Sequence, residues 1–287
     1  MGKDKLQLRA FAKINLFLDI KGILKGGMHE LDMLMRLIDL YDEVSLKKAA
    51  SISVSGVDGV DMEKNIAFRA AKLFFNKTGI SGGVLIKIKK NIPFMSGMGG
   101  GSADAAAVLL GLDILYETSL GIEKLMQMGK SLGADVPFML FGGCARAGGI
   151  GEKLIPIQDK IDPYYLIAKP HGGIPTAGCF RLYDEMPSEE IKKGDINACI
   201  KALETGDLSL LAIYNALEEP AKKLLPEIGS LLEKIQLAAD AAFMTGSGST
   251  CIGLFTDEAR AKMALEYLKG ECAFIAIAKG TDKITYA

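Results

Sequence analysis

The stretch PFMSGMGGGSAD, residues 93–104, separates two segments of different periodicity. Residues 84–89 before it alternate apolar with basic side chains, which predicts a half-buried strand. Residues 105–115 after it are rich in Ala, Leu and Val and are long enough for about three helical turns. A strand, a glycine-rich loop and a helix in this order predict an anion-binding site. Glycines let backbone amides approach a ligand, and a helix N-terminus presents unpaired N–H groups.

This loop matches neither of two common phosphate-binding motifs. A Walker A loop requires G-x-x-x-x-G-K-[ST], and the GKS at 129–131 has Lys124 in place of the first glycine. The dinucleotide fingerprint G-x-G-x-x-G would end at Asp104. A glycine cluster alone could be only a tight turn. The flanking strand and helix favour a phosphate site, with Ser102 as the helix N-cap and a hydroxyl ligand.

The composition is that of a folded globular protein. The chain of 287 residues is long for one core and suits two domains. Its net charge of −1, without a basic stripe, argues against a nucleic-acid partner. No apolar run approaches ~20 residues and no signal segment is recognisable, so we expect a cytoplasmic protein with no membrane partner.

Cysteine and histidine usage argues against a metal centre. The five cysteines are odd in number and widely spaced, which predicts reduced, buried thiols. Only His29 and His171 are present, so the sequence predicts neither a histidine-rich metal cluster nor a histidine-based triad.

Lys13 and Asn15 fall on the same side of a strand predicted over residues 6–20. At the strand rise they are about 7 Å apart. Taken alone, this pattern is more often a solvated edge with an extended lysine.

Asp135 stands in GADVPF, residues 133–138, where Pro137 predicts a bend. An isolated Asp at such a place is commonly an N-cap. However, direct phosphoryl transfer from ATP to an alcohol needs a carboxylate near the hydroxyl, a cation beside it and a donor-rich cradle for the γ-phosphate.

Taken together, four segments resemble the motifs of the GHMP small-molecule kinases. AKINL at 12–16 resembles A-K-x-N-L, and the segment from 93 to 106 resembles P-x-x-x-G-L-G-S-S-A-A, with Met98 in place of Leu. GADVPF resembles the signature around the family's catalytic aspartate, and residues 243–253 resemble the third motif. The triple glycine is most similar to the 4-diphosphocytidyl-2-C-methyl-D-erythritol kinase branch.

The resemblance covers nearly the whole chain and implies an α+β, two-domain GHMP kinase fold. Its N-terminal domain would be ribosomal protein S5 domain 2-like, and its C-terminal domain ferredoxin-like. We expect the ATP-binding domain over residues 1–155 and the second domain over 156–287, with one helix over 221–237.

The resemblance also implies a catalytic pair and an ATP site. Asp135 would take the proton from the attacking hydroxyl, and Lys13 would steady the developing charge. Adenine would lie near Asn65, although this residue is equally well explained as an N-cap. The implied ATP-binding residues are Asn65, Lys90, Pro93, Gly97, Gly99, Gly100, Gly101 and Ser102. Mg²⁺ is expected with ATP, but the sequence shows no second carboxylate dedicated to it.

For the acceptor, residues 26–31 resemble the branch's D-G-Y-H-x-L, in which tyrosine stacks on cytosine and histidine hydrogen-bonds the base. Here Met28 stands in place of tyrosine, and a thioether contacts a ring more weakly than an aromatic does. The implied acceptor-binding residues are Asn15, Met28, His29, Thr176, Phe180, Gly246, Ser247 and Gly248.

The resemblance therefore implies a kinase that phosphorylates the 2-hydroxyl of 4-diphosphocytidyl-2-C-methyl-D-erythritol in the non-mevalonate isoprenoid pathway. Its partners would be ATP and this cytidine diphosphate alcohol, and it would be a monomer or weak homodimer. Two alternatives stay open, the first of them because of Met28. One is a GHMP kinase acting on homoserine, a mevalonate-like alcohol or a sugar alcohol. The other is a catalytically silent nucleotide-binding relative.

Overall fold

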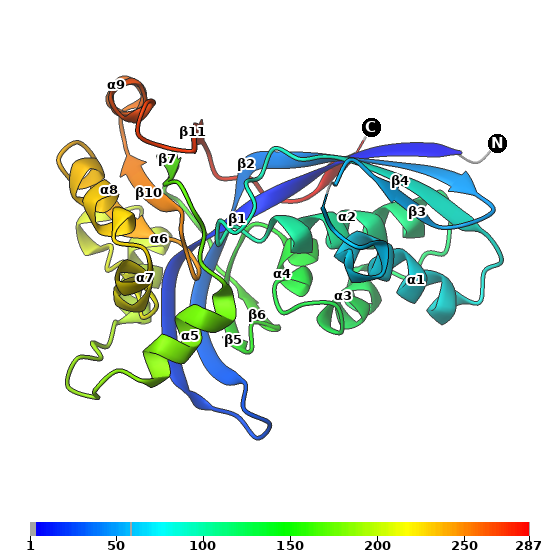
Figure 1. Ribbon diagram of the computed structural model, residues 1–287, viewed down its shortest axis with the longest axis horizontal. Coiled ribbons are helices and arrows are strands. Elements are labelled where there is room, and N and C mark those ends of the chain that lie inside the picture. The colour runs from blue at the N-terminus through cyan, green and yellow to red at the C-terminus, as the bar shows by residue number, and fades with distance from the viewer. Residues whose placement is uncertain (1–3, 58, 287) are drawn as a thin grey trace.

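The protein consists of two mostly antiparallel sheets and the helices packed against them. The computed structural model describes residues 4–57 and 59–286. Figure 1 shows the first sheet with its helices on the right and the second sheet on the left, and the long β1–β2 hairpin of the first sheet extends downward between them. None of the helices in the described ranges is long and apolar enough to cross a bilayer.

The first sheet is built on a long hairpin of β1 (Lys5–Ile23) and β2 (His29–Ala49). The first residues of β1 alternate between exposed and buried side chains, whereas residues 10–19 are buried on both faces, and β2 is likewise buried over residues 32–35. The strand order is β12-β1-β2-β4-β3, while β5 pairs with β2, β6 with β5 and β8 with β1. The remaining strands are β3 (Ser53–Ser55), β4 (Gly83–Lys89), β5 (Cys144–Gly149), β6 (Lys153–Pro156), β8 (Tyr214–Asn215) and β12 (Thr285–Tyr286).

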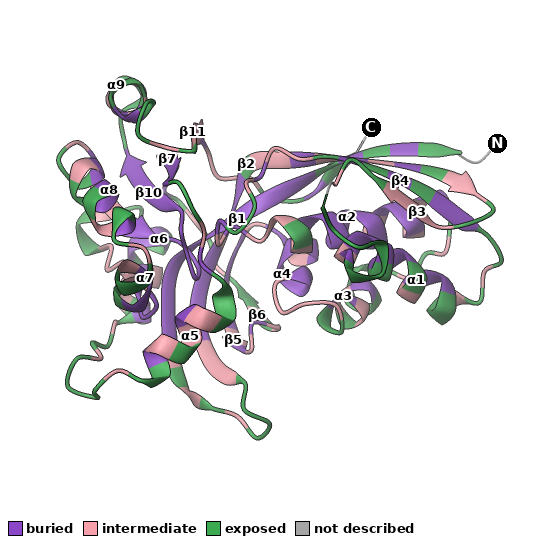
Figure 2. Cartoon of the chain, in the orientation of Figure 1, coloured by how far each residue is buried: buried purple, intermediate pink, exposed green. Residues whose placement is uncertain are grey.

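Four helices cover one face of this sheet: α1 (Ile66–Thr78), α2 (Gly100–Leu115), α3 (Ile122–Lys130) and α4 (Val136–Phe141). The predicted strand and helix on either side of the glycine loop are thus β4 and α2. Helix α2 lies directly on the sheet and is largely buried (Figure 2). Its small residues permit this approach: a Cβ at Gly111 would lie 2.4 Å from Leu46 Cδ1. This packing fixes the N-terminus of α2 relative to β1.

The second sheet has the antiparallel order β11-β7-β10-β9. Numbered along the chain, this is the 4-1-3-2 order of a ferredoxin-like sheet. Its strands are β7 (Tyr164–Lys169), β9 (Ala241–Met244), β10 (Cys251–Phe255) and β11 (Phe274–Ala278). The helices that follow α4 are α5 (Thr176–Asp184), α6 (Ile196–Thr205), α7 (Glu218–Leu224), α8 (Glu227–Gln236) and α9 (Glu258–Leu268), and short 3-10 turns cover Met62–Lys64 and Leu208–Leu210.

One predicted helix is wrong in extent. The segment expected as a single helix over 221–237 consists of α7 and α8, with a break at Leu225. Leu225 has an extended φ of −143°, and the following Pro226 disfavours helical geometry in the residue before it. The apolar periodicity continues across the break, so the pattern alone does not reveal it.

Candidate active site

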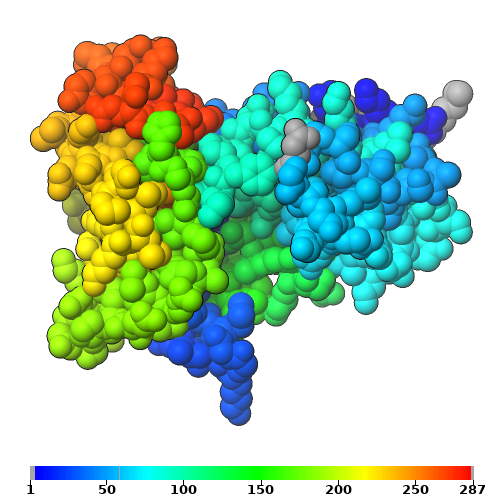
Figure 3. All heavy atoms as spheres, in the orientation of Figure 1, coloured from blue at the N-terminus to red at the C-terminus, as the bar shows by residue number. Residues whose placement is uncertain are grey.

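A cavity of about 510 Å³ lies between the elements around the first sheet and the elements around the second sheet. In the space-filling view the surface is hollowed between the cyan segments and the yellow-green segments (Figure 3). Fifteen of the eighteen predicted site residues line it: Lys13, Asn15, Asn65, Lys90, Pro93, Gly97, Gly99, Gly100, Gly101, Ser102, Asp135, Thr176, Phe180, Gly246 and Ser247. The other three, Met28, His29 and Gly248, lie outside the described lining.

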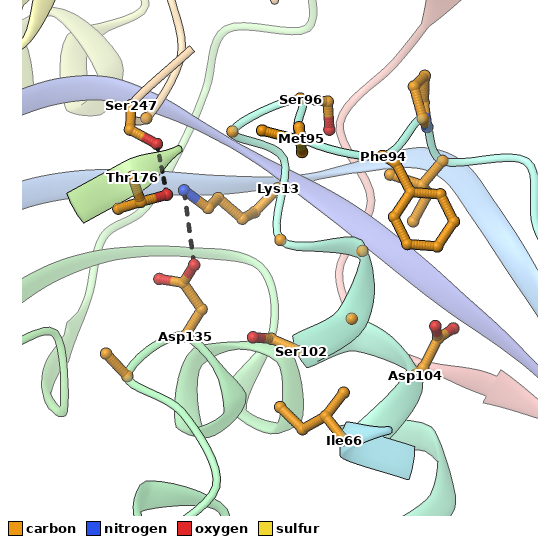
Figure 4. A pocket seen from close by; sticks show the side chains of 18 of the residues that line it. Lys13, Ile66, Phe94, Met95, Ser96, Ser102, Asp104, Asp135, Thr176 and Ser247 are labelled. Carbon is orange, nitrogen blue, oxygen red and sulfur yellow. Dashed lines mark hydrogen bonds and ion pairs between the residues drawn. The ribbon is translucent and has the colours of Figure 1, made fainter. Parts of the chain in front are cut away.

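Lys13 and Asp135 meet at the N-terminus of α2. Lys13 Nζ lies 3.8 Å from Asp135 Oδ2 and donates a 2.6 Å hydrogen bond to Asn15 Oδ1 (Figure 4). A Cβ at Gly99 would lie 3.4 Å from Lys13 Cγ and 3.5 Å from Asp135 Oδ2. The lysine, the acid and the glycine loop therefore converge on one point, although they lie far apart in the sequence.

The backbone around these two residues directs their side chains toward the cavity. The Lys13 amide donates to Met98 O at 3.1 Å, which joins β1 to the glycine loop. Asp135 occupies the position before α4, and within the described chain its side chain makes no capping bond. Its carboxylate is 29% exposed and directed at Lys13 (Figure 4). Asp135 thus has the position of an N-cap without the usual side-chain role.

Gly99, and not Ser102 as predicted, is the N-cap of α2. Gly99 has φ +70°, which favours glycine, and α2 begins at Gly100. Ser102 therefore lies in the first turn, with its hydroxyl in the cavity lining. The first turn of α2 presents its amides to the cavity, where the dipole favours an anion.

The second glycine loop supports the first by direct backbone contact. A Cβ at Gly97 would lie 2.3 Å from Thr245 O, and one at Gly246 would lie 2.6 Å from Gly97 O. Only glycine permits these approaches. Thr245 Oγ1 accepts a 2.8 Å hydrogen bond from the Asn15 amide, so the same loop also fixes β1.

Comparisons with known proteins identify the family of the chain. The family model described as the GHMP kinases N terminal domain matches residues 65–143, and the GHMP kinases C terminal model matches 189–273. A 4-diphosphocytidyl-2-C-methyl-D-erythritol kinase of Alkaliphilus metalliredigens is 39% identical over 271 residues, with 92% of each chain covered. One of Pelotomaculum thermopropionicum is 38% identical over 266 residues, covering 90% of this chain and 92% of its own. The chain belongs to the GHMP kinase family.

Solved structures support the same family assignment. A crystal structure of 4-(cytidine 5'-diphospho)-2C-methyl-D-erythritol kinase has a TM-score of 0.83 at 32% identity, covering 96% of this chain and 98% of the other. A homoserine kinase from Cytophaga hutchinsonii, at 19% identity, has a TM-score of 0.75 over 99% and 98% of the chains and shares the fold. The predicted two-domain GHMP kinase fold and the resemblance to its diphosphocytidyl branch are confirmed.

The far end of this GHMP kinase cavity holds a charged cluster that the sequence did not reveal. Lys90 Nζ donates to Asp104 Oδ2 at 2.7 Å and also bonds Asp42. Burial opposes protonation of Lys90, but Asp104 and Asp42 together raise its pKa. Burial also raises the pKa of Asp104 to about 7, against the opposing effect of Lys90. A polar residue within an alanine-rich helix gives no signal of such a cluster, because its partners come from β2 and the loop after β4.

Asn65 has the capping role that the sequence gave as one of its two explanations. Its Oδ1 accepts hydrogen bonds from Ala67 N at 2.9 Å and Phe68 N at 3.4 Å, at the start of α1. The residue also lines the cavity. Since the side-chain oxygen is used by the cap, the group that Asn65 can offer to a ligand is its NH₂.

At the opposite end, Thr176 Oγ1 lies 2.9 Å from Ser247 Oγ, and both residues line the cavity. Phe180 extends the lining from α5, and its ring stacks on that of His29 at 4.6 Å between centroids. His29 Nε2 lies 2.8 Å from Asp184 Oδ1. Met28 is 55% exposed at the turn of the hairpin. Phe180 therefore contacts His29 by ring stacking, whereas Met28 lies at the surface.

The cavity presents oxygen donors of the kind that Mg²⁺ prefers. In the ranges that the structure describes, no group of three or more His, Cys, Asp or Glu side chains could hold a metal alone. Ser102 and Asp135 nevertheless present a hydroxyl and a carboxylate to the cavity. Magnesium bound with a nucleotide takes oxygen ligands, commonly one or two from protein and the rest from phosphates and water.

Proposed function

We propose that the protein transfers the γ-phosphate of ATP to the 2-hydroxyl of 4-diphosphocytidyl-2-C-methyl-D-erythritol. The observation that supports this proposal is the position of Lys13 Nζ, 3.8 Å from Asp135 Oδ2 and beside Gly99. A carboxylate, a cation and a glycine-rich helix N-terminus are the parts that phosphoryl transfer to an alcohol needs. The names of relatives at 38–39% identity support the choice of acceptor.

In this proposal Asp135 acts as the base. As the acceptor oxygen forms its bond to the γ-phosphorus, the hydroxyl proton passes to the Asp135 carboxylate and the bond from the γ-phosphorus to the β,γ-bridging oxygen breaks. Lys13 lies within the range over which a cation stabilises a neighbouring carboxylate and the developing negative charge. Asn15 keeps the Lys13 ammonium in place through its 2.6 Å hydrogen bond.

The remaining residues would position the two substrates. The amides of the first turn of α2, with Ser102, would bind the phosphates. Mg²⁺ held by the phosphates, with Ser102 as its protein ligand, would neutralise charge on the β- and γ-phosphates. Thr176, Ser247 and Phe180, which lie on the side of the second sheet, would contact the acceptor. The hydroxyl of the acceptor would then lie between the two glycine loops.

The proposal is tested by release of ADP with a panel of acceptors. Purified protein is incubated with Mg-ATP and either the cytidine diphosphate alcohol, homoserine, mevalonate or a sugar alcohol, and ADP is measured by a coupled assay. We expect turnover with the cytidine diphosphate alcohol. Turnover only with another alcohol would change the acceptor, and ATP binding without any turnover would identify a silent relative.

A further inference from the structure

The buried amide of Asn215 binds two carbonyl groups at the second glycine loop (residues 245–250). Asn215 is 8% exposed, and its Nδ2 donates to Met244 O at 2.8 Å and to Gly246 O at 2.9 Å. Its Oδ1 accepts from Leu217 N at 3.0 Å. These partners fix the orientation of the side-chain amide, because the two carbonyls can only accept and the Leu217 amide can only donate. Both hydrogens of the NH₂ are therefore directed at the loop.

The loop that Asn215 holds reaches both glycine-rich ends of the site. Gly246 packs so closely on the first glycine loop that a Cβ there would lie 2.6 Å from Gly97 O. Ser247, the next residue, lies with its Oγ 2.9 Å from Thr176 Oγ1 in the cavity lining (Figure 4). Asn215 itself is not among the described residues that line the cavity. It can therefore influence a ligand only through the loop.

Strand β1 positions both Lys13 and Asn215. The short strand β8 pairs with β1 in parallel, with Asn215 opposite Leu18, and Ala216 N donates to Leu18 O at 2.9 Å. Lys13 stands on the same strand, five residues before Leu18. The place of the loop relative to Lys13 is thus set through β1, β8 and the Asn215 amide. Reacting groups need such alignment, since a misplacement of about 1 Å can reduce a rate by about 10²-fold.

We propose that Asn215 is a positioning residue for the transfer reaction. By donating to Met244 O and Gly246 O, it keeps the Ser247 hydroxyl, and the acceptor alcohol beside it, at a fixed distance from the γ-phosphate on the first glycine loop. The inference rests on the proposed function to the extent that the γ-phosphate passes to an alcohol bound at this loop.

Other contacts of the loop remain when Asn215 is changed. Thr245 Oγ1 still accepts from the Asn15 amide at 2.8 Å, and Ser249 N still donates to Met95 O at 3.4 Å. Loss of the Asn215 donors should therefore displace the loop without unfolding it. Under this condition alignment and stability can be measured separately.

The test is the rate of single-turnover phosphoryl transfer at saturating Mg-ATP and acceptor, compared between the unchanged protein and Asn215→Asp. The carboxylate has the shape of the amide and still accepts from Leu217 N, but it cannot donate to the two carbonyls. We expect the rate to fall roughly 10- to 100-fold. Asn215→Ser offers one donor instead of two and should also lose rate. It keeps the test in place if Asn215→Asp does not fold.

Glu218→Ala is the matched control. The Glu218 carboxylate accepts from Met244 N at 3.1 Å, so it stabilises the end of β9, and its hydrogen bond goes to the strand instead of the loop. Its transfer rate should stay close to that of the unchanged protein. Hydrogen exchange at residues 245–250, measured by mass spectrometry without substrates, should become faster in Asn215→Asp than in Glu218→Ala.

Two results would overturn the inference. One is a folded Asn215→Asp that transfers phosphate at the rate of the unchanged protein. The other is an equal loss of rate in Asn215→Asp and Glu218→Ala, which would attribute the loss to the general stability of β9. Absence of ADP release from the unchanged protein with every acceptor in the panel would instead reject the proposed function. In that case faster exchange at residues 245–250 in Asn215→Asp would keep Asn215 as the residue that positions the loop, and unchanged exchange would reject it.

Discussion

His29 Nε2 lies 2.8 Å from Asp184 Oδ1. Asp184 belongs to α5, and Phe180 of the same helix stacks against the imidazole ring of His29. Phe180 and Asp184 are four residues apart on α5 and therefore share a face. One helix thus contacts His29 at two points, by ring stacking and by a hydrogen bond. Because His29 begins β2 and α5 follows β7, this contact joins the tip of the long hairpin to the elements around the second sheet.

Asp184→Ala should raise the KM for the cytidine diphosphate alcohol and leave kcat nearly unchanged. If the carboxylate accepts from Nε2–H of a neutral ring, Nδ1 is the acceptor that His29 would offer to the base that the family resemblance places beside it. Loss of one such hydrogen bond typically costs about 0.5–1.5 kcal/mol, which predicts a roughly 2- to 12-fold rise in KM. Steady-state kinetics with varied acceptor and saturating ATP measures it.

Asp184→Asn provides the rescue for that experiment, because its amide oxygen still accepts from Nε2–H. Its KM should lie close to that of the unchanged protein. Glu185→Ala, at the neighbouring exposed position, controls for loss of a surface acid. Equal KM values for Asp184→Ala and Glu185→Ala would show that the contact with His29 has no role in acceptor binding.

Asp135→Asn should lose several orders of magnitude in turnover while ATP affinity changes little. The amide has the same shape but cannot take the hydroxyl proton, and general-base catalysis typically contributes about 10²–10⁴-fold. Loss of the negative charge beside Lys13 adds to this effect. Single-turnover transfer from radiolabelled ATP, with parallel ATP titration, separates chemistry from binding. A near-normal rate would reject Asp135 as the base.

The convergence of Lys13, Asp135 and the glycine loop at one end of the cavity could be predicted from the sequence, because its signals are local. The strand, loop and helix around the triple glycine each have their own periodicity, and Lys13 and Asp135 stand within short motifs. Asp104 and Asp184 were missed because their partners are distant in the chain. Lys90 lies 14 residues from Asp104, and His29 lies 155 residues from Asp184. The sequence does not distinguish such a polar residue from other polar residues on helices, because its partner is adjacent to it only in the folded protein.

The contribution of Asp104 to the stability of the protein should fall as the pH rises from about 4 to about 7. Burial raises the pKa of this carboxyl to about 7 in the folded protein, whereas an unperturbed Asp titrates near ~3.9. Between these values the folded protein holds a proton that the unfolded chain has lost. The contribution is therefore fully present below pH ~4 and is lost as the pH rises through about 7.

Asp104→Asn removes this titration, so its melting temperature relative to the unchanged protein should increase between pH 5 and pH 8. Differential scanning calorimetry at several pH values without nucleotide measures the difference. Asp195→Asn, at the exposed N-cap of α6, controls for exchange of a carboxylate for an amide. A difference between the two Asp104 proteins that does not vary with pH would mean that Asp104 is ionised throughout this range.

Gly246→Ala should destabilise the protein more than Gly79→Ala. Both glycines have positive φ, +58° and +69°, so alanine at either position costs about 1–2 kcal/mol in backbone strain. At Gly79 an added Cβ meets no described atom within 4 Å, whereas at Gly246 it would lie 2.6 Å from Gly97 O. The second contact is with backbone, so the glycine loop that contains Gly97 must shift to relieve it. Urea denaturation should show this extra loss of stability, and calorimetry should show weaker ATP binding only in Gly246→Ala. Equal effects in both variants would mean that the two glycine loops separate without cost, and that their contact does not hold the phosphate site in shape.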